Sequence, residues 1–153
     1  MNQNIKLKKN DIINQAQNAL LEAASPIDDY YGCFPKDIKT GLISFKDHST
    51  DIKTAYFICA SKIINAVSKA ENHLSKLPAV MIDADKHEDV ETVLICDKIL
   101  TLFSDLRKAL NSFTVTSEKI LSNAPPSYSG LLTALSEFKI KLTFFMNSIS
   151  SLQ

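Results

Sequence analysis

The sequence predicts an all-α protein, because long stretches without helix-breaking residues coincide with a helical spacing of apolar side chains. Neither glycine nor proline occurs in residues 42–77, 79–124 or 131–153. Within these stretches apolar residues recur every three or four positions, which is the period of an amphipathic helix. We therefore expect an up-and-down bundle of four to five helices, with a long aromatic-containing loop after the first helix.

The first helix is expected to begin at Asn10 or Asp11 and to end at Ala24, leaving residues 1–9 as a flexible tail. Pro26 would stop this helix, because proline has no backbone N–H to donate. The aromatic loop, "DDYYGCFPKD", follows at residues 28–37.

The second helix is expected to begin at Thr50 and Asp51, which are good N-cap residues. Pro78 would end it, and residues 79–85 would form a connector. Its apolar stripe fits the helical period closely. The stripe consists of Ile52, Ala55, Tyr56, Cys59, Ile63, Ala66, Val67, Ala70, Leu74 and Leu77.

The third helix opens with acidic residues, whose charge complements the helix dipole. From Val90 to Phe103 it is apolar on nearly every side, which predicts a position at the centre of the bundle. The β-branched residues 114–116 mark the expected kink, or a break into a short fourth helix. The last helix begins at Ser129 and carries a heptad seam. The seam consists of Leu131, Leu135, Phe138, Leu142, Phe145, Ile149 and Leu152.

Length and charge indicate a single domain, residues 1–153, that is not a nucleic-acid binder. Lys and Arg together number 17 and so do Asp and Glu, whereas a nucleic-acid-binding protein normally carries a basic excess. No apolar run approaches the ~20 residues of a transmembrane helix. The first residues contain no apolar core of a signal peptide, so no leader is expected.

No constellation of residues predicts an enzyme, a metal or a cofactor. The cluster at residues 83–89 begins like a calcium loop, but Glu88 and Leu94 stand where that loop needs glycine and glutamate. An acidic helix start explains the cluster better. No phosphate loop, zinc motif or nucleophile elbow occurs, and Cys33 lacks a partner cysteine or histidine that would activate it. We therefore expect a non-enzymatic protein without cofactor or metal.

Several segments of the sequence resemble the fungal hydrophobic surface-binding and cell-wall galactomannoprotein family. They are Tyr31-Gly32 before "TGLISF", an acidic start followed by "DVETVLICDKILTLFSDLRKALNSF", and "GLLTALSEFKIKL" with Leu135 and Phe138-Lys139. Members of that family are small secreted helical bundles, some of which bind fatty acids between their helices. The resemblance therefore implies a secreted or cell-wall protein; a cytoplasmic location is the alternative.

Surplus apolar residues on the helices favour a binding protein for a hydrophobic ligand or surface, such as a fatty acid held between the helices. In this hypothesis an aromatic lid covers an apolar interior, although a filled core capped by the same loop is equally compatible with the pattern. The predicted binding residues are Tyr30, Tyr31, Phe34, Phe103, Phe113, Phe138, Leu142, Phe145 and Met146. The alternative function is a cytoplasmic protein–protein interaction module, such as an inhibitor, an immunity protein or an effector docking bundle.

Overall fold

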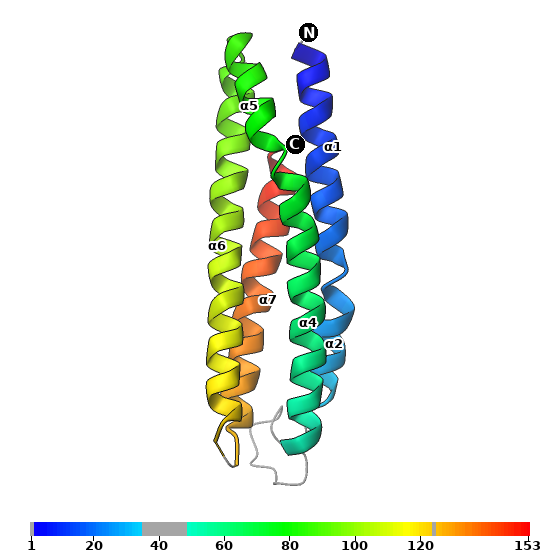
Figure 1. Ribbon diagram of the computed structural model, residues 1–153, viewed down its shortest axis with the longest axis vertical. Helices are drawn as coiled ribbons and strands as arrows, with labels where there is room; N and C mark the ends of the chain where they lie inside the picture. Colours follow the sequence, from blue (N-terminus) through cyan, green and yellow to red (C-terminus); the bar gives the residue numbers. More distant parts are fainter. Residues whose placement is uncertain (1, 35–48, 124) are drawn as a thin grey trace.

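The computed structural model describes residues 2–34, 49–123 and 125–153, and within them every regular element is an α-helix. This confirms the prediction of an all-α fold (Figure 1). The helices are α1 (Asn2–Leu21), α2 (Ala24–Gly32), α4 (Ser49–Leu74), α5 (Leu77–Lys86), α6 (Val90–Leu121) and α7 (Tyr128–Ser151).

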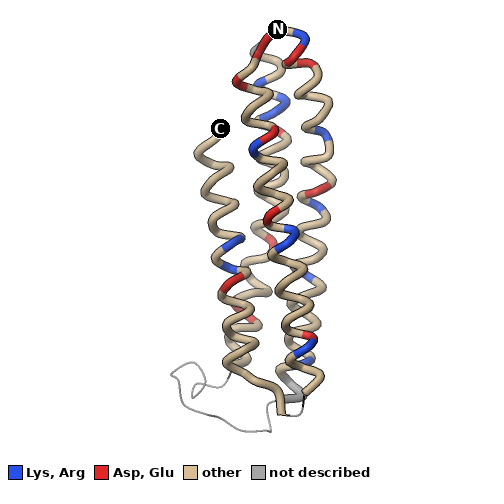
Figure 2. The backbone as a smooth tube through the Cα atoms, turned by 90° about the vertical axis from the view of Figure 1, so that its left-hand side faces the viewer, with Lys and Arg blue, Asp and Glu red and all other residues tan. Residues whose placement is uncertain are grey.

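These helices form four antiparallel rods, which run alternately down and up (Figure 1) and extend along the length of the bundle in the side view of Figure 2. Helices α1 and α2 make one bent rod, α4 and α5 make a second, and α6 and α7 are the third and fourth. Both chain ends point to the same end of the bundle, but α7 stops short of it, so that α1, α5 and α6 alone form that end (Figure 1). The predicted up-and-down bundle is confirmed.

The first rod differs from the prediction at both of its ends. Residues 2–9 are helical rather than a tail, and Ile5 and Lys9 are buried. The rod bends at residues 22–23 and continues as α2, which contains Pro26. Pro26 therefore lies in the first turn of a helix, where backbone N–H groups have no intrahelical acceptor and a proline loses nothing.

The aromatic residues predicted to lie in a loop belong mainly to this second segment. Tyr30 and Tyr31 are on α2, and Phe34 follows directly after it. The ring of Tyr30 lies 5.1 Å from that of Phe34 and 6.1 Å from that of Tyr56 on α4. The rest of the expected loop, from Pro35 onward, lies outside the described residues.

The second rod also continues through its proline. Helix α4 ends at Leu74, and α5 begins at Leu77 with Pro78 in its first turn. The predicted connector at residues 79–85 is therefore wrong. Leu77, Val80 and Ala84 are buried at helical spacing, so packing on α6 stabilises this turn of helix.

Helix α6 is unbroken from Val90 to Leu121, so the predicted kink or break at residues 114–116 is wrong. The helix-propensity penalty of β-branched residues is only a few tenths of a kcal/mol each. Burial of a large apolar side chain contributes about 1.5–3 kcal/mol, and Phe113 and Leu121 are buried on either side of this stretch. Burial therefore outweighs propensity and keeps the helix continuous.

The prediction that α6 lies at the centre of the bundle is also wrong. Val90 and Leu94 are 65% and 62% exposed, and α6 buries one face like its neighbours. The heptad seam of α7, in contrast, is confirmed: its first six members are buried and Leu152 is partly buried.

Contacting aromatic side chains connect α4 with α6 and α7. Tyr56 lies 5.7 Å from Phe113, and Phe113 lies 5.6 Å from Phe138 on α7. The Tyr56 hydroxyl donates to the Thr114 carbonyl at 3.3 Å and to the Glu118 carboxylate at 3.1 Å. Burial, together with the hydrogen bond to Glu118, raises the pKa of Tyr56 well above its usual value.

Candidate functional site: a groove between α6 and α7

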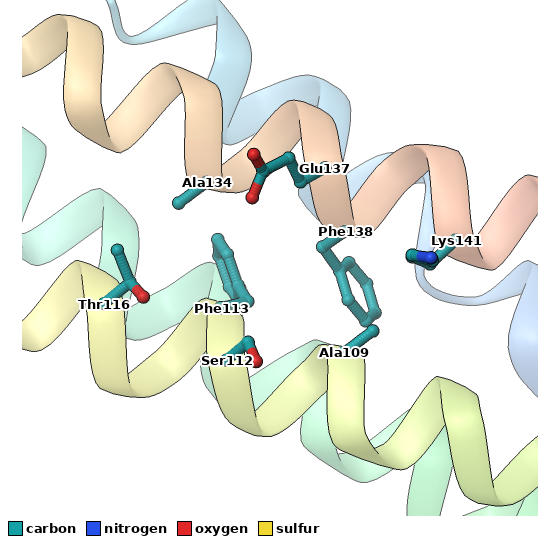
Figure 3. A pocket seen from close by; sticks show the side chains of 8 residues that line it. All are labelled: Ala109, Ser112, Phe113, Thr116, Ala134, Glu137, Phe138 and Lys141. Carbon is teal, nitrogen blue, oxygen red and sulfur yellow. The ribbon is translucent and has the colours of Figure 1, made fainter.

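Two neighbouring hollows lie in the seam between α6 and α7 and open to solvent. The lower one, nearer the α6–α7 turn, encloses about 170 Å³, and the upper one about 340 Å³. Both are lined by Ala109, Ser112 and Lys141, so they form one continuous feature, which we call the α6/α7 groove. Figure 3 shows the residues of the lower hollow.

Small side chains create the lower hollow. Ala109 and Ser112 are one turn apart on α6, and Ala134 is the small side chain on α7. Figure 3 shows Ala109 beside Phe138, and Ala134 across from Phe113 and Thr116. Phe113 and Phe138 form its floor, with ring centroids 5.6 Å apart and planes inclined by 30°. Both side chains are almost fully buried, so the floor is apolar and well packed.

The upper hollow has a similar floor. Leu106 and Phe145 are buried beneath it, and Phe145 packs on Phe103 at 5.7 Å. Phe144 lines this hollow and is 61% exposed, whereas the exposed Ile140, one turn earlier on α7, lines neither hollow. Exposed large apolar residues beside a hollow are typical of a binding surface.

Four charged side chains line the groove: Asp105 and Lys108 on α6, and Glu137 and Lys141 on α7. Among the described residues none of the four has an ion-pair or hydrogen-bond partner. By comparison, Arg107 on the other side of α6 is paired with Glu71 on α4. The groove therefore has unpaired charged side chains of both signs beside an apolar floor.

The nine predicted binding residues separate into two sets. Phe113, Phe138 and Phe145 line the α6/α7 groove. The other six line neither hollow: five are buried or partly buried in the core, and Tyr31 is 46% exposed on α2. The five are Tyr30, Phe34, Phe103, Leu142 and Met146.

The groove contains residues that the apolar pattern does not reveal. Ala109, Ser112 and Thr116 follow one another at helical spacing on the face of α6 that meets α7. A run of small side chains on one face is the available signal, but it does not by itself predict a hollow, because the side chains packed against it from α7 decide whether the space is filled. No pattern in the sequence around Lys141 predicts that it lines a hollow.

The acidic cluster at residues 83–89 is a helix start only at its last residue: residues 83–86 form the last turn of α5, and α6 begins at Val90, so the predicted acidic opening of the third helix is wrong for Asp83 and Asp85. The Asp89 carboxylate caps α6, accepting from the Thr92 N–H at 3.2 Å and from the Thr92 hydroxyl at 2.7 Å. These hydrogen bonds lower the pKa of Asp89. The described residues contain no group of three or more His, Cys, Asp or Glu side chains placed to hold a metal ion.

Two of the three cysteines are buried in the core. Burial raises the pKa of Cys59 to about 12 and also raises the pKa of Cys96, which disfavours the reactive thiolate. Cys33 is exposed.

Among the described helices none has the length and apolar character needed to span a membrane.

Comparisons with protein-family models, with curated proteins and with solved structures return no match for this chain. The resemblance to the fungal hydrophobic surface-binding family therefore stays a prediction.

Proposed function

We propose that this protein is a non-enzymatic helical bundle that binds a hydrophobic ligand, such as a fatty acid or another lipid, in the α6/α7 groove. The observation that carries the proposal is an open hollow whose floor is made of the buried rings of Phe113 and Phe138. Ligand sites are typically concave and mostly apolar, with a few polar groups at the rim, and span ~300–1,000 Å³. The two hollows, of about 170 and 340 Å³, together fall in that range.

The groove is a better candidate than the space under the expected lid. Tyr30 and Phe34 are 1% and 2% exposed, and their rings fill the core beside Tyr56. A ligand there would have to displace packed aromatic side chains, at a cost of several kcal/mol. The α6/α7 groove is already open and needs no such rearrangement.

The proposal is tested by filling the groove with a larger side chain and measuring ligand binding. Dodecanoate should raise the melting temperature of the wild-type protein, because a ligand that binds only the folded state stabilises it by mass action. Ala109→Leu should abolish this increase, since Ala109 lines both hollows. Thr101→Leu, an exposed position on α6 outside the groove, is the matched control and should retain it. An equal response of both variants, or none in the wild type, would contradict the proposal.

A protein–protein interaction module is the second candidate, favoured by the outer surface of α4. Phe57 and Ile64, two turns apart, are 49% and 45% exposed, and Ile58 is 53% exposed. Solvent-exposed apolar residues aligned on one helix suit a protein partner. Replacing Phe57 and Ile64 with serine should then abolish capture of that partner while leaving the dodecanoate response unchanged.

A further inference from the structure

The outer surface of α4 has a heptad pattern of its own, separate from the stripe that packs in the core. Phe57 and Ile64 are seven residues apart, or two helical turns, and are 49% and 45% exposed on the same face. Small exposed side chains precede and follow them at steps of three and four residues, the spacing with which one helix packs along another. We call this surface the α4 seam, and it consists of Thr54, Phe57, Ser61, Ile64 and Ser68.

The α4 seam has no charged side chain, and charged residues next to it are already paired. Glu71, the next residue in the heptad pattern, is paired with Arg107 on α6. Lys69 is paired with Glu22 at 3.1 Å. Exposed aromatic and aliphatic side chains without charges among them are typical of the centre of a protein interface. The seam therefore suits an uncharged helix surface rather than a charged ligand.

A second copy of α4 has such a surface and fits the seam when the two helices run antiparallel. A two-fold axis between Lys62 and Ile63 lies near the middle of α4, so the two helices overlap along nearly their whole length. Phe57 then lies opposite Ser68 of the second copy, and Ile64 lies opposite Ser61 of the second copy. Each large side chain meets a small one, so the helices can pack closely without overlap. Both contacts occur twice because of the symmetry.

The length of the seam determines how strong the contact can be. The residues from Thr54 to Ser68 span about 22 Å of helix, and a helix with its side chains is ~10 Å wide. A contact of this size is smaller than the ~800 Å² that each partner buries in a typical stable complex. We therefore expect a reversible dimer with a dissociation constant in the micromolar range.

We propose that this protein self-associates through the α4 seam as an antiparallel, two-fold symmetric dimer. The partner of the second candidate function, the interaction module, is in this inference a second copy of the chain. The inference does not depend on ligand binding, because no residue of α4 lines the α6/α7 groove.

Sedimentation equilibrium of the wild-type protein from about 1 µM to about 1 mM should show a mass that rises from one chain to two. Phe57→Lys should weaken the dimer roughly ten- to a hundredfold, because a charge replaces an apolar contact that occurs twice. Ser68→Glu should weaken it by a similar factor, because each carboxylate would lie opposite Phe57 of the second copy. Ile140→Lys, at an exposed apolar residue of α7, is the matched control and should dimerise like the wild type.

A mixture of the two variants tests the antiparallel register. In a mixed dimer one end keeps the wild-type pair of Phe57 and Ser68, and the other end places the introduced lysine opposite the introduced glutamate. The mixture should therefore associate more tightly than either variant alone, by roughly fivefold or more. In a parallel dimer the two substitutions would not meet, and the mixture would show no recovery.

The possible failures are distinguishable. A wild-type protein that stays monomeric at every concentration, or an equal loss in Ile140→Lys, would overturn the inference, and a mixture without recovery would overturn the antiparallel register. Ser68 is exposed, so Ser68→Glu keeps the test valid if Phe57→Lys, whose ring packs on Tyr56 at 5.1 Å, fails to fold. All folded variants should keep the dodecanoate response of the wild type, so loss of the dimer and loss of ligand binding are separate results.

Discussion

The two halves of the bundle differ in the continuity of their helices. In the first half, formed by α1, α2, α4 and α5, each rod is bent once, at residues 22–23 and at residues 75–76. In the second half, formed by α6 and α7, both rods are unbroken. Each bend lies just before a helix whose first turn contains a proline, Pro26 or Pro78. Proline therefore marks where a new helical segment begins in this protein.

The same two halves differ in the surfaces they leave open. A hollow of about 330 Å³ in the first half, beside the bend at Lys76, is lined mainly by polar and charged residues with Ile12 and Val80 among them. The α6/α7 groove instead has the rings of Phe113 and Phe138 as its floor. The straight pair of helices thus offers the hollows with an aromatic floor.

The largest expected effect tests the continuity of the second half. Val115→Pro should destabilise the protein by about 3 kcal/mol or more, because proline in a helix interior removes a hydrogen bond and clashes with the preceding turn. Val115 is 58% exposed. The control Val115→Ala, which shortens the side chain without restricting the backbone, should therefore change the free energy of unfolding little. Pro78→Ala in α5 should change the free energy of unfolding by less than about 1 kcal/mol. Urea denaturation measures all three, and a mild effect of Val115→Pro would show that α6 tolerates a break.

The start of the second half depends on the Asp89 cap. Asp89→Ala should cost about 1–2 kcal/mol at neutral pH, because the Thr92 N–H loses its acceptor. The fold lowers the pKa of Asp89, so its stabilisation is present above the unfolded-state pKa of about 3.9 and is lost as pH falls through the lower folded-state pKa. Asp89→Asn should keep the cap and remove this pH dependence. Urea denaturation from pH 7 to pH 2 would contradict this if both proteins lost stability in parallel.

The contact between the halves is tested by a pair of tyrosines. Tyr56→Phe should lower the free energy of unfolding by about 1 kcal/mol, because the hydroxyl that donates to Thr114 and Glu118 on α6 is removed. Tyr30→Phe should be neutral or stabilising, since the buried Tyr30 hydroxyl has no hydrogen-bond partner among the described residues. Denaturation of the two variants side by side provides the comparison; equal losses would show that the Tyr56 hydrogen bonds do not hold the halves together.

The smallest expected effect is in the turn between α5 and α6, which connects the two halves. There Glu88 adopts a left-handed conformation with φ of 57°. Glu88→Gly should raise the free energy of unfolding by roughly 0.5–1 kcal/mol, because glycine adopts this conformation without steric cost after a helix. Lys86→Gly, in the last turn of α5, should instead destabilise the protein. A loss of stability in Glu88→Gly would mean that its side chain matters more than its backbone.

Much of the fold could be predicted from the sequence because a helix is a local structure with a local period. The stripe of α4 and the seam of α7 are buried almost as expected, from Ile52 to Leu77 and from Leu131 to Ile149. The candidate site was predicted less completely. Phe113, Phe138 and Phe145 are among the predicted binding residues, but Ala109, Ser112 and Lys141 are not.

By itself the sequence determined the all-α class and the buried faces of α4 and α7. Only the tertiary structure decided whether helix resumes after Glu22 and Ser75 and whether α6 continues past Thr114. In each case packing of the next apolar turn on a neighbouring helix outweighs a weak local preference. The groove was also decided by the tertiary structure, because a small residue leaves a hollow only where the side chains packed against it do not fill the space. The spacing of apolar residues along one helix does not determine which residues of another helix pack against them.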